Sequence, residues 1–481
     1  GVQTCALPIL NKELNLQPVT ETEILKVLYR LVMQDSIVVE ENRVYITQQH
    51  QEEEDTASMI ARKLHERIPV LTIEKELEEA QEDLNITLSE HQKEAVRMVF
   101  ANPISIITGG PGTGKTTVLK IILYIYQKKC GNEVKLMAPT GRAARRMAES
   151  TGSGDATTMH MALGLFGDGD YEALIDELSA DFINVDEVSM VDMHLAYEFF
   201  YKVKAGARVL LVGDVHQLPS VGAGDVFRQL ILCGKIPVTV LNLVYRQGKD
   251  SNIPINAQLI NEGKTNLQWG DDFQMIECSG ADAAAQIVKN IYLKEIQVYG
   301  MEQVQILSPY KVRSAAGVLE LNRSLQDDVN PPVSGKQELH LGGEIFREGD
   351  RILQNKNTEV ASNGDLGTLV QISEDEDNNP IVQIVFTDGR RVKYEAEQVE
   401  MMEHANAITI HKSQGSECHV VIIPWLKAFY PMLKRNIFYT GITRAKLRVY
   451  IVGEWKAVCQ AIHADDTGTR KTMLAAKIQQ Y

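Results

Sequence analysis

Residues 105–116 read SIITGGPGTGKT, an apolar run that leads into a glycine-rich segment, a lysine and a threonine. The segment fits the pattern GxxxxGK[ST] over 109–116, and a helix-like run follows over 117–126. In this order the glycines let backbone N–H groups face phosphate oxygens, and the start of the helix adds partial positive charge. We expect Lys115 to reach the β- and γ-phosphates of ATP and Thr116 to hold Mg²⁺. The predicted nucleotide contacts of the segment are Gly110, Gly112, Thr113, Gly114, Lys115, Thr116 and Thr117.

Two further apolar runs deliver polar side chains that we expect at the same edge of a sheet. The run at 182–185 ends in Asp186, predicted to bind Mg²⁺, and Glu187, predicted to polarise the attacking water as general base. The run at 209–212 leads to Gln217, which we expect to sense the γ-phosphate, because open α/β sheets bind ligands at the carboxyl ends of their strands. His216 beside it is predicted to be an ordinary surface-loop residue.

Short β-branched runs alternate with helical segments along the rest of the chain. Such runs lie at 105–107, 134–137, 182–185 and 209–212, and again at 304–307, 420–423 and 449–452. Strands that are apolar throughout are buried on both faces, which is typical of parallel α/β sheets. Residues 340–401 differ, because short strands alternate there with turn signals such as Asn363-Gly364. The sequence predicts an α/β fold with two parallel-sheet blocks and a small β-barrel, 340–401, inserted in the second.

The chain before residue 85 follows other patterns. Helical spacing at 22–33 and two short strands at 37–39 and 44–46 predict a partial winged helix over 10–50. Its wing carries more acid than base, so a packing or linker role is favoured over a DNA contact. Residues 51–84 predict a charged helical connector. Residues 1–9, GVQTCALPI, look non-native, and we expect the chain to begin inside a longer protein.

Composition limits the classes of function. The net charge of −15 argues against general affinity for nucleic acid, but much of the acid is clustered near 52–55, 74–83 and 374–377, so charge neither supports nor excludes DNA. The six cysteines form no CxxC pair, so no zinc site is expected, and scattered thiols suit a reducing cytoplasm. No apolar run approaches the ~18 residues of a membrane span, so no membrane partner is expected.

The ordered set of motifs resembles the superfamily 1 helicases, specifically their RecD-like branch. Gln92 matches the glutamine that reads adenine in that family. The other matching segments are APTGRAA (138–144), TTMH (157–160), DEVSMVD (186–192), GDVHQLPSVG (213–222), YRQ (245–247), LSPY (307–310), NGDLG (363–367), IHKSQGSE (410–417) and YTGITRA (439–445). So many motifs in the correct order, spread over residues 20–481, are far more specific than any one of them.

The resemblance implies two RecA-like P-loop NTPase domains, 85–245 and 246–339 with 402–481, whose closure and opening step a motor along a strand. It implies an ATP-dependent DNA helicase that uses ATP and Mg²⁺, moves 5′→3′ on single-stranded DNA and opens tailed duplex DNA. The catalytic residues that it implies are Lys115, Glu187, Gln217, Arg246 and Arg444. Gln92, Arg246 and Arg444 join the nucleotide contacts, and both arginines stabilise charge on the γ-phosphate from the second domain. We expect a monomeric, cytoplasmic motor; the sequence identifies no protein partner.

The residues that the resemblance places against DNA are mostly small and polar. Hydroxyls and backbone N–H groups hold phosphates without reading sequence, which suits a motor that is indifferent to sequence. These residues are Pro139, Thr140, Gly141, His160, Ser308, Thr409, His411 and Ser413. Nearby arginines at 142, 145 and 146 either line the channel or face solvent.

Three alternatives remain open. Relatives place a strand-separating hairpin before Asp186, but the insertion here, near 161–180 with LFGDGDY (165–171) as its candidate tip, is short. A short wedge favours a translocase that does not open duplexes. A second alternative is a nucleotide-gated recruitment module, in which ATP controls the binding of a partner. The presence of Glu187, Gln217, Arg246 and Arg444 argues against it. An RNA track is also open, because backbone contacts discriminate only through the sugar.

Overall fold

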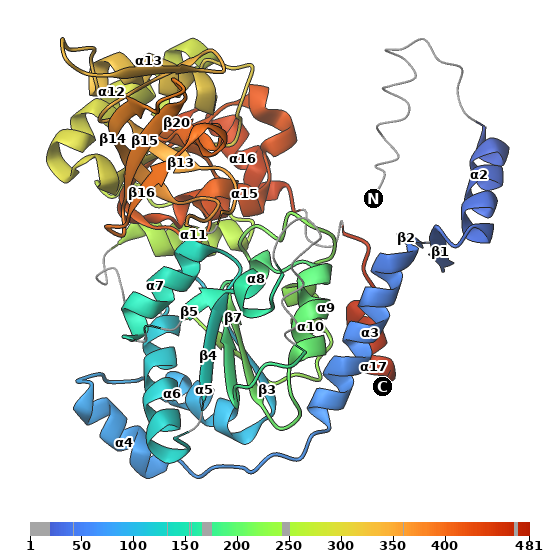
Figure 1. Cartoon of the computed structure of the whole chain (residues 1–481). Helices are drawn as coiled ribbons and strands as arrows, with labels where there is room; N and C mark the ends of the chain where they lie inside the picture. Colours follow the sequence, from blue (N-terminus) through green and yellow to red (C-terminus); the bar gives the residue numbers. More distant parts are fainter. Residues whose placement is uncertain are drawn as a thin grey trace.

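The computed structural model describes residues 20–481 except 42, 132, 153, 155, 166–175, 243–250, 359 and 466–469. Two α/β lobes, each built on a parallel sheet, lie against one another (Figure 1). We call residues 85–242 lobe 1 and residues 251–465 lobe 2. The α/β fold with two parallel-sheet blocks is therefore confirmed.

Lobe 1 contains a six-stranded sheet in the order β5-β4-β6-β7-β3-β8, with every neighbouring pair parallel. Its strands are β3 (Ile104–Gly109), β4 (Val134–Ala138), β5 (Ala156–Thr158), β6 (Phe182–Val185), β7 (Arg208–Gly213) and β8 (Val238–Leu241). Its helices are α5 (Glu90–Ala101), α6 (Lys115–Lys129), α7 (Gly141–Thr151), α8 (Met159–Ala162), α9 (Met193–Lys202) and α10 (Val226–Leu232), with the 3₁₀ turn η1 (Val188–Met190). The central strands β3, β6 and β7 are buried along their whole length, as their apolar runs predict.

Lobe 2 repeats the scheme with a five-stranded parallel sheet in the order β18-β10-β19-β20-β9. Its strands are β9 (Phe273–Glu277), β10 (Val304–Ser308), β18 (Ala407–Thr409), β19 (Cys418–Trp425) and β20 (Ala445–Gly453). Its helices are α11 (Asn252–Asn261), α12 (Ala281–Tyr299), α13 (Val318–Val329), α15 (Arg435–Ile442) and α16 (Trp455–His463), with 3₁₀ turns η2 (Met301–Gln303), η3 (His411–Ser413) and η4 (Lys427–Met432). Both sheets therefore present the carboxyl ends of parallel strands, where ligands of open α/β sheets bind.

An antiparallel module is inserted in lobe 2. The hairpin of β11 (Glu338–Leu341) and β12 (Glu344–Arg347) precedes a sheet in the order β16-β15-β14-β13-β17. Its elements are β13 (Arg351–Gln354), β14 (Leu366–Glu374), β15 (Pro380–Phe386), β16 (Arg391–Tyr394), α14 (Ala396–Val399) and β17 (Met402–His404). Because Ile352 pairs with His404, the module extends past the predicted end at 401. Its closure into a barrel stays a prediction.

The first described residues form the expected helix and hairpin. Helix α2 (Glu21–Met33) projects from the body and buries none of its residues, and β1 (Ile37–Glu40) pairs with β2 (Arg43–Ile46) (Figure 1). Next come α3 (Thr47–Leu64), which packs along lobe 1 against α9, and α4 (Glu74–Asp83). The helical connector is present, and a DNA-binding role for the hairpin module stays a prediction.

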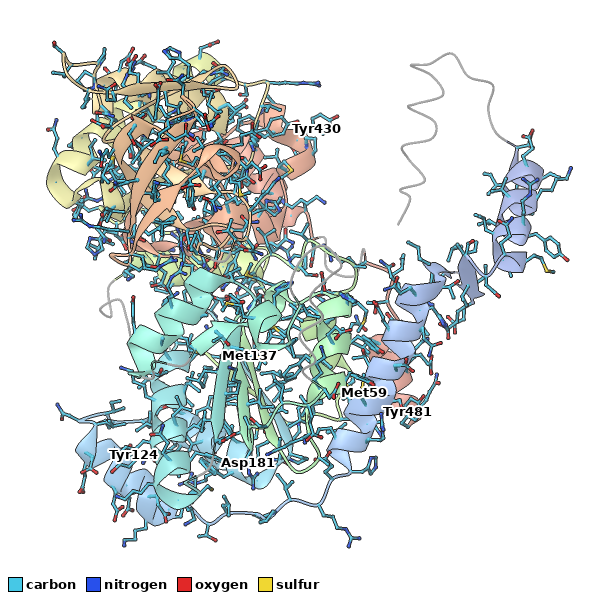
Figure 2. All side chains as sticks on the ribbon, viewed as in Figure 1. Met59, Tyr124, Met137, Asp181, Tyr430 and Tyr481 are labelled. Carbon is cyan, nitrogen blue, oxygen red and sulfur yellow. The ribbon has the colours of Figure 1, made fainter. Side chains whose placement is uncertain are left out.

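The C-terminal helix α17 (Leu474–Gln480) departs from the predicted boundaries. The second domain was expected to run to 481, but Leu474 and Ile478 lie in the core of lobe 1 with residues such as Phe227. The reason is that α17 buries its apolar side against α3 and α10 instead of the lobe 2 sheet (Figure 1). Figure 2 shows Tyr481 beside α3, where its hydroxyl donates to Glu54 Oε1 over 3.2 Å. None of the described helices is long and apolar enough to cross a membrane.

Candidate functional site

The glycine-rich loop of lobe 1 joins β3 to α6 and has the conformation that its glycines permit. Gly112 and Gly114 have φ of 75° and 88°, left-handed values that favour glycine. A Cβ on Gly109 would lie 2.7 Å from Leu241 O, so β3 and β8 also require a glycine there. Lys115 Nζ donates to the carbonyls of Gly109 over 2.6 Å and Gly110 over 2.9 Å. The ammonium therefore lies over the loop, at the start of α6, which is the position from which a P-loop lysine can reach phosphate oxygens.

Gln92 supports this loop from α5. Its side-chain oxygen accepts from Ser89 N over 3.0 Å, and its amide donates to Thr113 O over 3.3 Å. It is 4% exposed and completes the capping box of α5. An amide nitrogen carries two donors, so one N–H remains for a base. The residue predicted to read adenine thus lies beside the P-loop and also fixes it.

Asp186 and Glu187 follow β6 as predicted. Asp186 Oδ1 accepts from Glu187 N over 2.8 Å, and Glu187 has a left-handed φ of 52°. Such a conformation costs about 1–3 kcal/mol in a non-glycine residue and is concentrated at functional sites. Burial raises the pKa of Asp186, while burial and then the charge of Asp186 raise that of Glu187. The charges of Lys115, Arg146 and, for Glu187, Arg444 oppose this rise.

A divalent cation fits this arrangement. Asp186 is a half-buried carboxylate whose charge is disfavoured by burial, and Thr116 lies in the first turn of α6, which follows β3, a strand that β7 separates from β6 in the sheet. Oxygen donors are the ligands of Mg²⁺, which usually takes one or two carboxylates together with phosphates. No group of three or more His, Cys, Asp or Glu that could hold a metal ion occurs among the described residues.

Asp214, at the end of β7, is the centre of a hydrogen-bond cluster that the sequence analysis did not single out. This fully buried carboxylate accepts from His216 N, from Gln217 Nε2 over 3.3 Å and from Tyr439 Oη over 2.8 Å. Gln217 is 7% exposed, and its Oε1 has no partner within the described part of the chain. That oxygen can accept from a water, as the γ-phosphate role requires. His216 itself is exposed, as predicted.

Lobe 2 reaches this cluster through α15. Burial, and then the charge of Asp214, raise the pKa of Tyr439 well above its ordinary value, so its hydroxyl remains a donor. Thr440 Oγ1 accepts from Leu218 N over 3.0 Å, and Gln414 Nε2 donates to Leu218 O over 3.2 Å. A Cβ on Gly110 would lie 3.1 Å from the Tyr439 hydroxyl, which places that hydroxyl at the P-loop as well. Both lobes therefore meet at the nucleotide loop.

The two predicted arginines have different outcomes. Arg444 is 3% exposed, donates to Thr440 O over 3.2 Å and to Ser416 O over 3.3 Å, and acts electrostatically on Glu187 across the lobe boundary. It is therefore brought to the site. Arg246 lies in 243–250, outside the described residues.

A charged cleft between the lobes lies beside Arg444. Its lining includes basic residues from both lobes together with acidic partners, namely Arg142, Arg145, Arg146, Arg351, Arg444, Lys446, Asp365, Asp388 and Glu417. Arg145 of α7 pairs with Asp365 and, over 2.9 Å, with Asp388 of the inserted module, while Arg146 pairs with Glu417. Arg145 and Arg146 remain partly exposed, with 30% and 37% of their side chains accessible, and their ion pairs bridge the two lobes.

Several residues predicted to contact DNA lie at the carboxyl ends of β4, β5, β10 and β18. Thr140 caps α7 by accepting from Ala143 N, with Pro139 half-buried before it. A Cβ on Gly415 would lie 3.3 Å from Thr140 Oγ1, so the segments 139–141 and 411–415 adjoin across the lobes. His160 is exposed at the start of α8, and Thr409 and His411 are half-buried. These positions form one polar rim.

Three of the predicted DNA contacts are covered. Ser308 is fully buried and donates to Ala316 O over 2.9 Å, and Ser413, 1% exposed, donates to Ile410 O over 2.7 Å. Gly141 is buried against Ser362 of the inserted module. The two hydroxyls shape the loops that carry their neighbours, and direct contact of these three residues with DNA stays a prediction. The candidate hairpin tip at 165–171 lies almost wholly outside the described residues.

The chain matches three protein families. Residues 87–281 match an AAA domain, residues 404–452 a UvrD-like helicase C-terminal domain, and residues 321–386 the SH3 domain of ATP-dependent RecD-like DNA helicases. The last match covers most of α13 and most of the inserted antiparallel module.

Two relatives that are similar in sequence agree with these matches. The chain is 33% identical over 394 residues to the ATP-dependent RecD2 DNA helicase of Deinococcus radiodurans, covering 82% of this chain and 52% of that protein. It is 28% identical over 438 residues to the RecD subunit of the RecBCD enzyme of Mycolicibacterium smegmatis, covering 81% and 76%. The Pif1 helicase of Candida albicans has a similar structure, with 19% identity, a TM-score of 0.48 and coverage of 76% of this chain and 94% of that one. The chain thus spans about half the length of the Deinococcus relative.

Proposed function

Because the chain belongs to the RecD-like branch of the superfamily 1 helicases, we propose that it is an ATP-dependent DNA helicase that moves 5′→3′ along single-stranded DNA and opens duplex DNA. The observation that carries the proposal is the composite site, in which Tyr439 and Arg444 of lobe 2 reach Asp214 and Glu187 of lobe 1. Hydrolysis that needs both lobes couples each ATP to lobe closure, which is how a motor steps. The direction of movement rests on family membership alone.

The chemical roles that we propose rest on the matched motifs and on the positions of those side chains that the structure describes. Lys115 holds the β- and γ-phosphates, Glu187 polarises the attacking water, Gln217 orients it, and Arg444, with Arg246, stabilises charge on the γ-phosphate oxygens. Thr116 and Asp186 would hold Mg²⁺, which when bound neutralises phosphate charge. Gln92 reads the adenine, and the loop contacts are Gly110, Gly112, Thr113, Gly114 and Thr117.

The nucleic-acid track in this proposal is the polar rim between the lobes. Thr140, His160, Thr409 and His411 contact phosphates of one DNA strand without reading bases. We further propose that the motor works as a monomer in the cytoplasm on single-stranded and tailed duplex DNA. The free thiols Cys130, Cys233, Cys278, Cys418 and Cys459 support a reducing compartment.

The first test is strand separation on 5′-tailed, 3′-tailed and blunt duplexes with ATP and Mg²⁺. We expect only the 5′-tailed duplex to open, and we expect the Lys115→Ala variant to open none. Opening of the 3′-tailed duplex alone would contradict the direction but keep the helicase. ATP turnover raised by single strands without any opening would instead indicate a translocase, and turnover that does not respond to strands would indicate a recruitment module. RNA versions of the tails test the sugar preference.

The role of Glu187 is tested separately by Glu187→Gln. Since the amide cannot act as general base, we expect kcat to fall by about 10²–10⁴-fold. ATP binding, measured with a fluorescent ATP analogue, should remain within about twofold, because the P-loop contacts are unchanged. Turnover at the parent rate would show that another group activates the water.

A further inference from the structure

The segment after α16 returns from lobe 2 to lobe 1 and contacts a loop beside the candidate active site. The apolar side of α17 completes the core of lobe 1. In addition, Thr472, Met473 and Lys477 anchor the segment by polar contacts with Glu53 and Glu54 of α3. Lys477 is 2% exposed and pairs with Glu54 over 2.6 Å and Glu40 over 3.2 Å. These anchors lie on the α3 side. Arg470, at the other end of the segment, contacts the loop at 220–224 instead of α3.

Arg470 binds the backbone of the loop at 220–224. Its Nη1 donates to the carbonyl oxygens of Gly222 and Gly224, both over 2.7 Å, and its Nη2 donates to Ser220 O over 2.6 Å. Nη1 also lies 3.3 Å from Ser220 Oγ. A planar guanidinium with several fixed donors suits such converging carbonyls, and an ammonium, with three donors on one atom, cannot span them in the same way.

The loop that Arg470 holds is connected to two predicted catalytic residues, Gln217 and Glu187. It follows Gln217 in sequence, and its Ala223 O accepts from Met193 N over 2.9 Å, at the end of the segment that follows Glu187. The packing there is tight, since a Cβ on Gly222 would lie 2.1 Å from Asp192 Oδ2. Gly224 has a φ of 94°, so this path of the backbone is open to few residues other than glycine. A displacement of the loop therefore displaces both Gln217 and the segment behind Glu187.

We propose that Arg470 is a positioning residue for ATP hydrolysis, which fixes the loop 220–224 and through it the orientation of Gln217 and Glu187. The proposal rests on the proposed ATPase function and adds a residue from outside the motifs. It gives the segment that follows lobe 2 a role in the chemistry of lobe 1. It also predicts that turnover, and not nucleotide affinity, depends on Arg470, because the roles proposed for Gln217 and Glu187 are to orient and polarise the attacking water and not to hold the phosphates.

The test compares Arg470→Ala and Arg470→Lys with Lys477→Met, which weakens the same segment without touching the loop. In steady-state kinetics with single-stranded DNA, we expect Arg470→Ala to lower kcat by about tenfold to a hundredfold while KM for ATP stays within about twofold. Arg470→Lys should recover part of kcat. Lys477→Met should lower the melting temperature at least as much as Arg470→Ala but keep the parent kcat. An equal loss of kcat in Lys477→Met, or parent kcat in Arg470→Ala, would overturn the proposal.

A second measurement does not need activity. Hydrogen–deuterium exchange of peptides covering 214–225 should be faster in Arg470→Ala than in the parent and unchanged in Lys477→Met. Unchanged exchange in Arg470→Ala would overturn the positioning role whatever the kinetics show. If the parent hydrolyses ATP but opens no duplex, the helicase function fails and the kinetic test of Arg470 still stands. If the parent hydrolyses no ATP, the proposed function fails and the role of Arg470 in hydrolysis fails with it, whereas exchange still shows whether Arg470 fixes the loop.

Discussion

At the scale of a residue, the hydroxyl of Tyr439 carries the sharpest prediction, because it joins α15 of lobe 2 to Asp214 of lobe 1 by a side-chain hydrogen bond of 2.8 Å. A hydrogen bond to a charged group contributes about 1.5–3 kcal/mol. If it forms in the closed state that hydrolyses ATP, Tyr439→Phe should lower the DNA-stimulated kcat by about tenfold to a hundredfold and leave KM for ATP nearly unchanged.

Tyr292→Phe is the matched control for this substitution. Tyr292 is also fully buried, and its hydroxyl donates to Asn406 Oδ1 over 3.0 Å inside lobe 2, away from the site. We expect Tyr292→Phe to lower the melting temperature by a similar amount. Its kcat should equal that of the parent. If both variants lose the same fraction of kcat, the Tyr439 hydroxyl contributes only to stability.

Residue types and spacing predicted the P-loop, the Asp186-Glu187 pair and Gln217, because each of these follows a buried strand directly and a strand end fixes its place. Tyr439 stood within a matched motif without a role, Asp214 was not singled out, and Arg470 belonged to no motif. Their contacts join residues more than 200 positions apart, so only the packing of the lobes reveals them. Ser308 and Ser413 were predicted to contact DNA because they belong to matched motifs. Both are buried, and a motif alone does not show whether its hydroxyls are exposed.

At the scale of an element, α17 is predicted to stabilise lobe 1. Leu474 is fully buried in that core, so Leu474→Ala should lower the free energy of unfolding by about 2–5 kcal/mol. Thermal unfolding should show this as a lower melting temperature for the transition of lobe 1. Leu447→Ala is the control, because Leu447 on β20 is 48% exposed. It should change the free energy of unfolding by no more than about 0.5 kcal/mol. A parent-like melting temperature for Leu474→Ala would mean that α17 does not stay docked in solution.

Within the two parallel sheets, the strands that the sequence identified are those with two neighbours. β3, β6, β7, β10, β19 and β20 are apolar over most of their length because both faces are covered. The edge strands β5, β8, β9 and β18 were missed, since they are short and three of them are partly exposed along much of their length. The position of α17 was wrong for another reason: its amphipathic pattern shows that one face is buried, but not against which lobe.

At the scale of the whole molecule, ion pairs hold the lobes together beside the site. Arg145 and Arg146 of α7 reach Asp365, Asp388 and Glu417 on the other side. Salt screens charges over about 3 Å at 1 M and about 10 Å at 0.1 M. We therefore expect the radius of gyration from small-angle X-ray scattering to increase with ionic strength as the lobes separate.

The variant Arg145→Gln/Arg146→Gln should have the larger radius at low salt and show little further change. Lys128→Gln, which breaks a surface pair between α6 of lobe 1 and Glu79 of α4 and touches no part of lobe 2, should behave like the parent. A parent radius that is constant across the salt range would show that the apolar and hydrogen-bonded contacts around Tyr439 suffice to keep the lobes closed.

The return of α17 to lobe 1 has a consequence for synthesis on the ribosome. Domains generally fold as they emerge, with the N-terminal one first. Here the core of lobe 1 needs Leu474 and Ile478, which are translated only after all of lobe 2. Nascent lobe 1 therefore cannot complete its core, and the apolar surfaces of α3 and α10 that α17 covers stay exposed, until α17 has been synthesised. The order of translation and the order of completion are reversed in this chain.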